Sequence, residues 1–220
     1  MIKVPSLAWR QHRQSRDNGA NADFRPSIWQ QLTGKLARLD SMSNEQLLTL
    51  FASSTNTAAM HMLVERLHRD LHYFLLCQSD RVLADDISQM TWLTVLQKAG
   101  QFTPQGSQSA KAWLFRIARH QLIDELRRQQ RWQFDSLDKA DGCAASPTID
   151  SNEYDDLQQA FERVLAHLPF AQREAFVLQQ EGFSIQQISD ICEQNIETIR
   201  SRLRYSRNAF KKLLGDHYES

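Results

Sequence analysis

Apolar residues recur at the spacing of an α-helix in nearly every patterned segment of this 220-residue chain. Residues three and four apart share one face of a helix, so such a stripe predicts a helix that packs on a core. Residues that form tight turns are few, with seven Gly and five Pro. We therefore predict an all-α fold. The longest stripe consists of Met60, Leu63, Val64, Leu67, Leu71, Phe74 and Leu75.

Capping signals predict where several helices begin. Ser43 with Gln46 has the spacing of a capping box, in which each side chain accepts a hydrogen bond from the other residue's backbone amide. Ser184 with Gln187 repeats this spacing, and Asn195 is a further N-cap. Further helices are predicted over about 84–99, 110–132, 157–168, 171–180, 184–192 and 195–214. The apolar residues of the helix predicted over 84–99 are Ile87, Met90, Trp92, Leu93 and Leu96.

A change in composition divides the chain into two small helical domains. The segment 135–152 is acidic, contains Gly142 and Pro147, and has no apolar period, which is typical of a flexible linker. The predicted parts are an N-terminal extension (1–41), a first helical domain (42–134), the linker (135–152), a second helical domain (153–214) and a tail (215–220).

Charge is strongly sorted along the chain, although 26 basic and 26 acidic residues give a formal net charge of zero. Residues 109–134 contain six basic and two acidic side chains, and residues 199–214 contain six basic and none acidic. Between them, residues 135–162 contain one basic and eight acidic side chains. Such asymmetry indicates contact with nucleic acid at the two basic segments.

The second basic segment belongs to a predicted helix-turn-helix, a short helix followed by a brief turn and a longer helix. Ile196, Ile199 and Leu203 form the inner stripe of the longer helix, so the polar residues between them face outward. Arginine can bind guanine through two hydrogen bonds in the major groove, and a hydroxyl near the helix start can bond to a phosphate. The candidate DNA-binding residues are Thr198, Arg200, Ser201, Arg204 and Arg207.

The first basic segment interleaves cationic and aromatic residues along one helix. This combination suits single-stranded or opening DNA, because cations follow the phosphates and rings stack on unpaired bases. Trp113 lies on the apolar stripe and is predicted to be core, whereas Trp132 and Phe134 lie at a polar helix end. The candidate residues are Arg116, Arg119, His120, Arg127, Arg128 and Arg131.

Signals for other chemistry are weak. His61, His68 and His72 fall at helical spacing near Cys77, but ordinary packing is the favoured interpretation, and we predict no metal site and no cofactor. The three cysteines are widely spaced, which fits free thiols in a reducing cytoplasm. No apolar run is long enough to span a membrane.

An enzyme is also disfavoured, and no catalytic residue is predicted. The sequence contains no Ser-His-Asp, P-loop or zinc spacing. A nuclease would have to use Asp85 and Asp86 with the histidines, yet adjacent helix residues diverge by about 100° and do not converge easily on one ion.

Several motifs carry a family resemblance. Ala84-Asp-Asp-Ile-Ser-Gln-Met-Thr-Trp, Ala112-Trp-Leu-Phe-Arg-Ile-Ala-Arg-His and Ile123-Asp-Glu-Leu-Arg-Arg resemble regions 2.2 to 2.4 of bacterial RNA polymerase sigma factors of the extracytoplasmic-function (ECF) group, in the sigma-70 family. Leu168-Pro, Arg173, Gly182-Phe-Ser and Thr198-Ile-Arg-Ser-Arg-Leu resemble region 4 of the same group. The resemblance covers residues 43–214 in order.

The resemblance implies a region 2 bundle and a region 4 helix-turn-helix that together direct core RNA polymerase to promoter DNA, without enzymatic activity. Asp86, Gln89 and Thr91 match the segment that docks on polymerase. The basic residues of 116–131 would contact the −10 element, and those of 198–207 the −35 element. The acidic linker would run towards the RNA exit path. Such a protein is a monomer in the holoenzyme, takes no small-molecule substrate, and is cytoplasmic, held inactive by an anti-sigma factor that can sit at the inner membrane.

The chain departs from the family pattern at several positions. Met90 replaces a usual Glu in the polymerase-binding segment, and His120 replaces a usual Asn beside the strand-opening loop. Glu193-Gln194 replaces a Gly and an aliphatic residue in the helix-turn-helix, so we expect a less tight turn.

Two alternatives remain open at this stage. The first is an ordinary helix-turn-helix regulator with an unrelated N-terminal domain, although such a protein has no need for a second basic and aromatic helix. The second concerns residues 1–41, which are either a regulatory or docking segment or lie upstream of a translation start at Met42.

Overall fold

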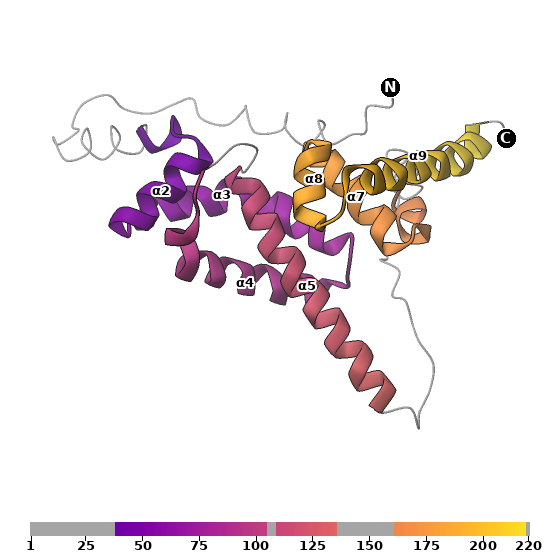
Figure 1. The fold of residues 1–220 in the computed structure, drawn as a ribbon, viewed down its shortest axis with the longest axis horizontal. Coiled ribbons are helices and arrows are strands. Elements are labelled where there is room, and N and C mark those ends of the chain that lie inside the picture. The colour runs from indigo at the N-terminus through magenta and orange to yellow at the C-terminus, as the bar shows by residue number, and fades with distance from the viewer. Residues whose placement is uncertain (1–37, 105–108, 136–160, 219–220) are drawn as a thin grey trace, which may run out of the picture.

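A computed structural model of the chain describes residues 38–104, 109–135 and 161–218 (Figure 1). Over these residues every regular element is helical, which confirms the all-α prediction. The helices are α2 (Asn44–Ser54), α3 (Thr57–Leu76), α4 (Arg81–Lys98), the short 3-10 helix η2 (Ala99–Gln101), α5 (Ala110–Asp135), α7 (Phe170–Gln180), α8 (Ile185–Cys192) and α9 (Ile196–Tyr218), with a further helical segment over residues 161–167.

The first bundle consists of α2 to α5, with α3 packed against both α2 and α4. The predicted stripe of α3 is the reason: Leu63, Leu67, Leu71 and Phe74 are buried on it. The capping box at Ser43 is present in both directions and starts α2. α4 begins three residues before the apolar pattern suggested, because the side chain of Asp80 accepts a hydrogen bond from the backbone amide of Leu83.

The second bundle consists of residues 161–167 with α7, α8 and α9. Its core is partly aromatic, with the rings of Phe176 and Phe210 stacked at 4.4 Å between centroids and Phe161 against both. The capping box that starts α8 is present, and the side chain of Asn195 accepts a hydrogen bond of 2.7 Å from the backbone amide of Thr198 at the start of α9. The predicted helix-turn-helix is therefore formed.

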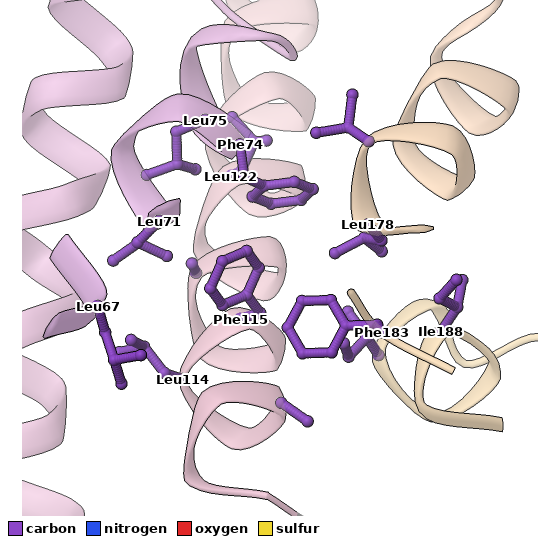
Figure 2. Packing of buried hydrophobic residues seen from close by; sticks show 14 of the residues in the cluster. Leu67, Leu71, Phe74, Leu75, Leu114, Phe115, Leu122, Leu178, Phe183 and Ile188 are labelled. Carbon is purple, nitrogen blue, oxygen red and sulfur yellow. The ribbon is translucent and has the colours of Figure 1, made fainter. Parts of the chain in front are cut away.

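The two bundles pack directly on each other, with α8 and α7 against α5 and α3 (Figure 1). At the contact, Phe115 of α5 meets Phe183 edge to face, with ring centroids 4.9 Å apart. Leu178 and Ile188 lie beyond Phe183 in the same buried cluster (Figure 2). The domains expected to be joined through a linker thus also share a hydrophobic contact.

Some predictions fall on other parts of the chain. The interpretations of residues 1–37 and of the acidic linker beyond Asp135 lie outside the described residues. Within the described ranges, no helix combines the length and the apolar character that a membrane crossing requires.

Candidate nucleic-acid interface

The start of helix α5 is fixed by a side chain from α2. The backbone amide of Ala110 donates a hydrogen bond of 2.9 Å to Oε1 of Glu45, 65 positions earlier. Burial alone would raise the pKa of the Glu45 carboxyl, but this bond and others from nearby groups lower it overall. The carboxylate also lies where the positive end of the α5 dipole favours an anion. Glu45 could not be predicted from the sequence, because nothing local links it to a helix so far along the chain.

Of the predicted basic residues on α5, two face the second bundle. The guanidinium of Arg119 contacts the carboxylate of Glu174 at 2.7 and 3.4 Å, and the imidazole of His120 lies 2.9 Å from Glu193. Glu174 is buried, whereas Glu193 is exposed. Arg116 is half-buried on the same helix.

The other basic residues of α5 lie further along the helix, where it extends beyond the bundle (Figure 1). Arg127 and Arg128 are exposed and pair with carboxylates one turn earlier, Asp124 at 4.0 Å and Glu125 at 2.8 Å. The hydrogen bond from Arg128 lowers the pKa of Glu125. The backbone at 131 continues α5, while the side chains of Arg131, Trp132 and Phe134 lie outside the described residues.

Of the three residues predicted to contact polymerase, Asp86 and Gln89 are exposed on helix α4, but Thr91 is fully buried. Its hydroxyl donates a hydrogen bond of 2.8 Å to Oε1 of Gln121, whose amide nitrogen in turn donates to Thr94 Oγ1 at 2.8 Å. Thr91 therefore holds α4 against α5 rather than offering a surface group.

The exposed side of α4 is partly apolar. Met90 and Leu93 are 50% and 58% exposed, and Val82 and Leu96 are also exposed. The apolar pattern includes Met90, Leu93 and Leu96 but does not distinguish these exposed residues from the buried ones. The buried side is instead formed by Leu83, Ala84, Ile87, Ser88, Thr91 and Val95. We call the exposed set of Val82, Asp86, Gln89, Met90, Leu93 and Leu96 the α4 face.

Helix α9 presents its predicted row to solvent, because Ile199 and Leu203 point into the core. Arg200 pairs with Glu197 one turn earlier, and the guanidinium of Arg204 lies 5.4 Å from the ring of Tyr205. Arg207 donates a hydrogen bond of 2.9 Å to the side chain of Gln179. The exposed members of the row are Arg200, Ser201, Arg204 and Arg207, with Thr198 half-buried at the helix start.

The turn between α8 and α9 is tight, so the expectation of a looser turn is wrong. Glu193 adopts the left-handed conformation, with φ of 53° and ψ of 45°, and its amide bonds to the carbonyl of Ser189. This is the backbone that a glycine would supply at a helix C-terminus, and a side chain there costs about 1 kcal/mol. The glutamate therefore keeps the geometry and bears strain.

Two of the three histidines near Cys77 have polar partners from α4. His72 Nε2 lies 2.6 Å from Asp85, and the indole nitrogen of Trp92 donates to Nδ1 of His68 at 3.2 Å. Among the residues that the structure describes, no three His, Cys, Asp or Glu side chains are grouped so as to hold a metal. Cys77 and Cys192 are free thiols.

The model for sigma-70 region 2 matches residues 63–132, and the model for sigma-70 region 4 matches residues 158–209. The chain is 35% identical over 135 residues to the ECF RNA polymerase sigma factor EcfG of Rhodopseudomonas palustris, covering 60% of this chain and 71% of that protein. The chain belongs to the ECF sigma factors of the sigma-70 family.

One further relative and two solved structures are also similar to this chain. SigC of Mycobacterium tuberculosis is 29% identical over 167 residues, which is 74% of this chain and 86% of that protein. Among solved structures, the sigma factor RpoE of Bartonella quintana, in complex with the anti-sigma factor NepR, has a TM-score of 0.61 at 29% identity and covers 70% of this chain and 96% of its own. CnrH, in complex with the cytosolic domain of CnrY, has a TM-score of 0.57 at 21% identity over 79% and 97%, and shows the fold alone.

As a sigma factor, the chain directs promoter recognition and transcription initiation. Sigma factors are regulatory proteins rather than catalysts. In the terms of the family, α3 to α5 carry region 2 and α7 to α9 carry region 4.

Proposed function

We propose that this sigma factor docks on core RNA polymerase through the α4 face and contacts the −10 element through α5 and the −35 element through α9. The proposal rests on the α4 face, which is separate from the basic residues of α5 and from those of α9. This face is exposed and combines apolar side chains with the acidic Asp86. An ordinary helix-turn-helix regulator needs no such surface in addition to its DNA-binding helix.

The polymerase contact rests on Asp86 and Gln89, flanked by Met90 and Leu93 on the same helix. Exposed apolar side chains beside polar ones are typical of a protein interface, because burying them stabilises the complex while the polar groups fix its orientation. Met90, which is half exposed, adds apolar area to this face. Thr91 takes part only indirectly, through its bond to Gln121.

The −35 contact rests on the row along α9. The helix-turn-helix places its second helix in the major groove, where arginine binds base edges or phosphates. Arg200, Ser201 and Arg204 lie in the first half of that helix, and Thr198 at its start is positioned for a phosphate. Arg207, further along α9, would contact the DNA backbone.

The −10 contact rests on α5, with Arg116, Arg119, His120, Arg127, Arg128 and Arg131 as its basic residues. Cations along one helix attract the phosphates of a strand that is being separated from its partner. The structure supports this for Arg127 and Arg128, which are exposed. Arg119 and His120 have other partners in the state described here.

The remaining proposals follow from the family. The domain limits are 42–134 and 153–214, joined by the acidic linker of 135–152. The partners are core RNA polymerase, promoter DNA and an anti-sigma factor, since RpoE and CnrH were solved with NepR and with the cytosolic domain of CnrY. The protein acts as a monomer in the holoenzyme, in the cytoplasm where polymerase works, and needs no cofactor.

The test is run-off transcription with purified core polymerase on a library of promoters. We expect the chain to bind core and to direct initiation from a subset of the library. Leu93→Glu should abolish core binding, because it places a charge in the centre of the α4 face. Ser53→Glu, at an exposed position of α2, is the matched control and should bind normally. Failure of the unmodified chain to bind core would refute the proposal.

A further inference from the structure

We propose that the N-terminal extension of this sigma factor is a DNA-binding arm, which a clasp at Arg66 attaches to region 2 beside the start of α5. The arm comprises residues 1–37, and its ligand is the phosphate backbone of promoter DNA next to the −10 element. The inference rests on the proposed role of α5 in −10 recognition, because that role decides which part of the promoter the arm meets.

The clasp consists of one guanidinium that binds the backbone just before α2. Arg66 of α3 donates hydrogen bonds of 2.7 Å to the carbonyl of Met42 and 2.6 Å to the carbonyl of Asp40. Longer bonds of 3.4 Å reach the side chain of Asn44 and the carbonyl of Leu39. A planar guanidinium presents five donors in fixed directions, so it can hold several acceptors of one segment at once. Arg66 therefore fixes the path of the chain where it enters the first bundle.

The folded part of region 2 continues upstream of Met42. Leu39 is only 8% exposed and belongs to the hydrophobic core, and residues 38–40 are helical. A chain that began at Met42 would lose this apolar contact and two of the carbonyls that Arg66 binds. Leaving donors of a partly buried guanidinium without partners is costly. These contacts favour a protein that includes the extension over one that starts at Met42.

The clasp also sets where the arm joins the bundle. Glu45 lies in the first turn of α2, three positions after Met42, and accepts a hydrogen bond of 2.9 Å from the backbone amide of Ala110 at the start of α5. One short stretch of chain is therefore bound to α3 through Arg66 and to α5 through Glu45. The arm begins beside the N-terminal end of the helix whose basic residues are proposed to contact the −10 element.

The composition of the arm suits a nucleic-acid strand. Residues 1–37 contain six basic and two acidic side chains, and three of the arginines follow one another at intervals of three. Basic N-terminal arms bind nucleic acid because their cations neutralise phosphates, and aromatic rings stack on bases that have lost their partners. The three closely spaced arginines are Arg10, Arg13 and Arg16, and the large aromatic residues are Trp9, Phe24 and Trp29.

The chain itself contains another anionic segment that a basic arm could bind. Residues 135–162 include eight acidic side chains and one basic one. Double-stranded DNA, however, carries a negative charge about every 1.7 Å of its axis and releases condensed counterions when a cation binds. The charges of the acidic segment are spread along the chain among uncharged residues, so promoter DNA is the stronger polyanion and the ligand that we favour.

The first experiment measures how salt affects promoter binding by the holoenzyme, with the full chain and its Arg10→Gln/Arg13→Gln/Arg16→Gln variant. This variant leaves the clasp and every described residue unchanged. A plot of log K against log salt concentration should be shallower by about 2–3 for the variant, because each phosphate contact contributes about 0.9 to the slope. Core binding should not change. An equal slope would overturn the inference, and so would tighter DNA binding by the variant, which would assign the arm to the acidic segment.

Arg69→Gln/Arg81→Gln/Arg163→Gln is the matched control. It removes the same charge from exposed positions that lie outside the α4 face and outside the proposed DNA contacts. It should keep the slope of the unmodified chain, and a change as large as that of the arm variant would show that only net charge matters. If the full chain fails to bind core polymerase, the proposed function is lost. The same salt dependence, measured for the free chain on a −10 oligonucleotide, then still decides whether the arm binds DNA.

The second experiment locates the arm on the promoter. An iron chelate that cleaves DNA is attached through Ser6→Cys in the Cys143→Ser background. In the holoenzyme it should cut the promoter beside the −10 element. Adding Arg66→Lys, which keeps the charge but loses the planar fork of donors, should spread the cuts over a longer stretch of DNA. Absence of cleavage, or cleavage confined to the −35 element, would overturn the inference.

Discussion

The guanidinium of Arg119 lies 2.7 Å from the carboxylate of Glu174, and 55 positions of sequence separate the two residues. Glu174 is buried in α7 and also accepts a hydrogen bond from the thiol of Cys192 at 3.4 Å. A buried carboxylate requires a partner of opposite charge, and here that partner comes from the other bundle. The pair is therefore a point at which the stability of region 4 depends on region 2.

Replacing either member of this pair should destabilise the protein more than replacing both. Glu174→Met leaves Arg119 enclosed without a counter-ion, which we expect to lower the free energy of unfolding by about 3 kcal/mol. Arg119→Met likewise leaves the Glu174 carboxylate buried without a counter-ion. The double variant should lose clearly less than the sum, measured by urea unfolding followed by circular dichroism. Losses that add to within about 0.5 kcal/mol would show that the two residues are independent.

Arg204→Ala should weaken recognition of the −35 element. If the guanidinium binds a guanine through two hydrogen bonds, the loss is about 1–3 kcal/mol and is confined to one base pair. Competition between promoter variants, measured with the holoenzyme, distinguishes this from a loss that is equal on all sequences, which would assign Arg204 to a phosphate. Arg163→Ala, at an exposed position of the same bundle, is the control and should leave recognition intact.

Glu45 should make stability depend on pH in a defined direction. Its carboxyl has a pKa below the ordinary 4.5 in the folded protein, so its contribution is complete above 4.5 and is lost as the pH falls through the lowered pKa. Glu45→Gln should therefore be less stable than the unmodified chain at neutral pH, by about 0.5–1 kcal/mol for the lost charge at the helix terminus. Unfolding experiments across the acid range should show this difference shrinking. A difference that is constant with pH would contradict the role.

The two described cysteines should resist thiol reagents until the protein unfolds. Burial raises the pKa of Cys77 to about 12, with the nearby Glu181 and Glu162 acting in the same direction against a hydrogen bond with Tyr73. Burial and the charge of Glu174 also raise the pKa of Cys192. Because the thiolate is the reactive form, little of it exists at neutral pH.

The measurement is the rate of reaction with a disulfide reagent in a Cys143→Ser background, which leaves only these two thiols. The native protein should react slowly, and the same protein in urea should react at the rate of a free cysteine. Rapid reaction of the native protein would mean that the surroundings of Cys77 or Cys192 open frequently.

The parts of the fold that sequence predicted well are those set by neighbours along the chain. The capping boxes at Ser43 and Ser184 depend on residues three positions apart, and both are formed. The inner stripe of α9 follows from periodicity once Asn195 fixes its start. The row of exposed residues on α9 was therefore predictable as well.

The parts that could not be predicted depend on which surfaces meet. Thr91 was expected at the polymerase interface but is buried, because α5 supplies Gln121 as its partner. Leu93 was grouped with the apolar residues of its helix but faces solvent. Similarly, no local pattern relates Lys111 to Glu181, since periodicity contains no information about residues 70 positions apart.

The left-handed backbone at Glu193 has a consequence for how the protein can change. Glutamate codons become glycine codons through one substitution at the second base. Glycine would at once relieve the strained turn and remove the carboxylate that faces His120. A mutagenised gene samples this exchange often, and a screen for variants that resist thermal unfolding should therefore recover it, because relief of the strained backbone outweighs the loss of an exposed ion pair.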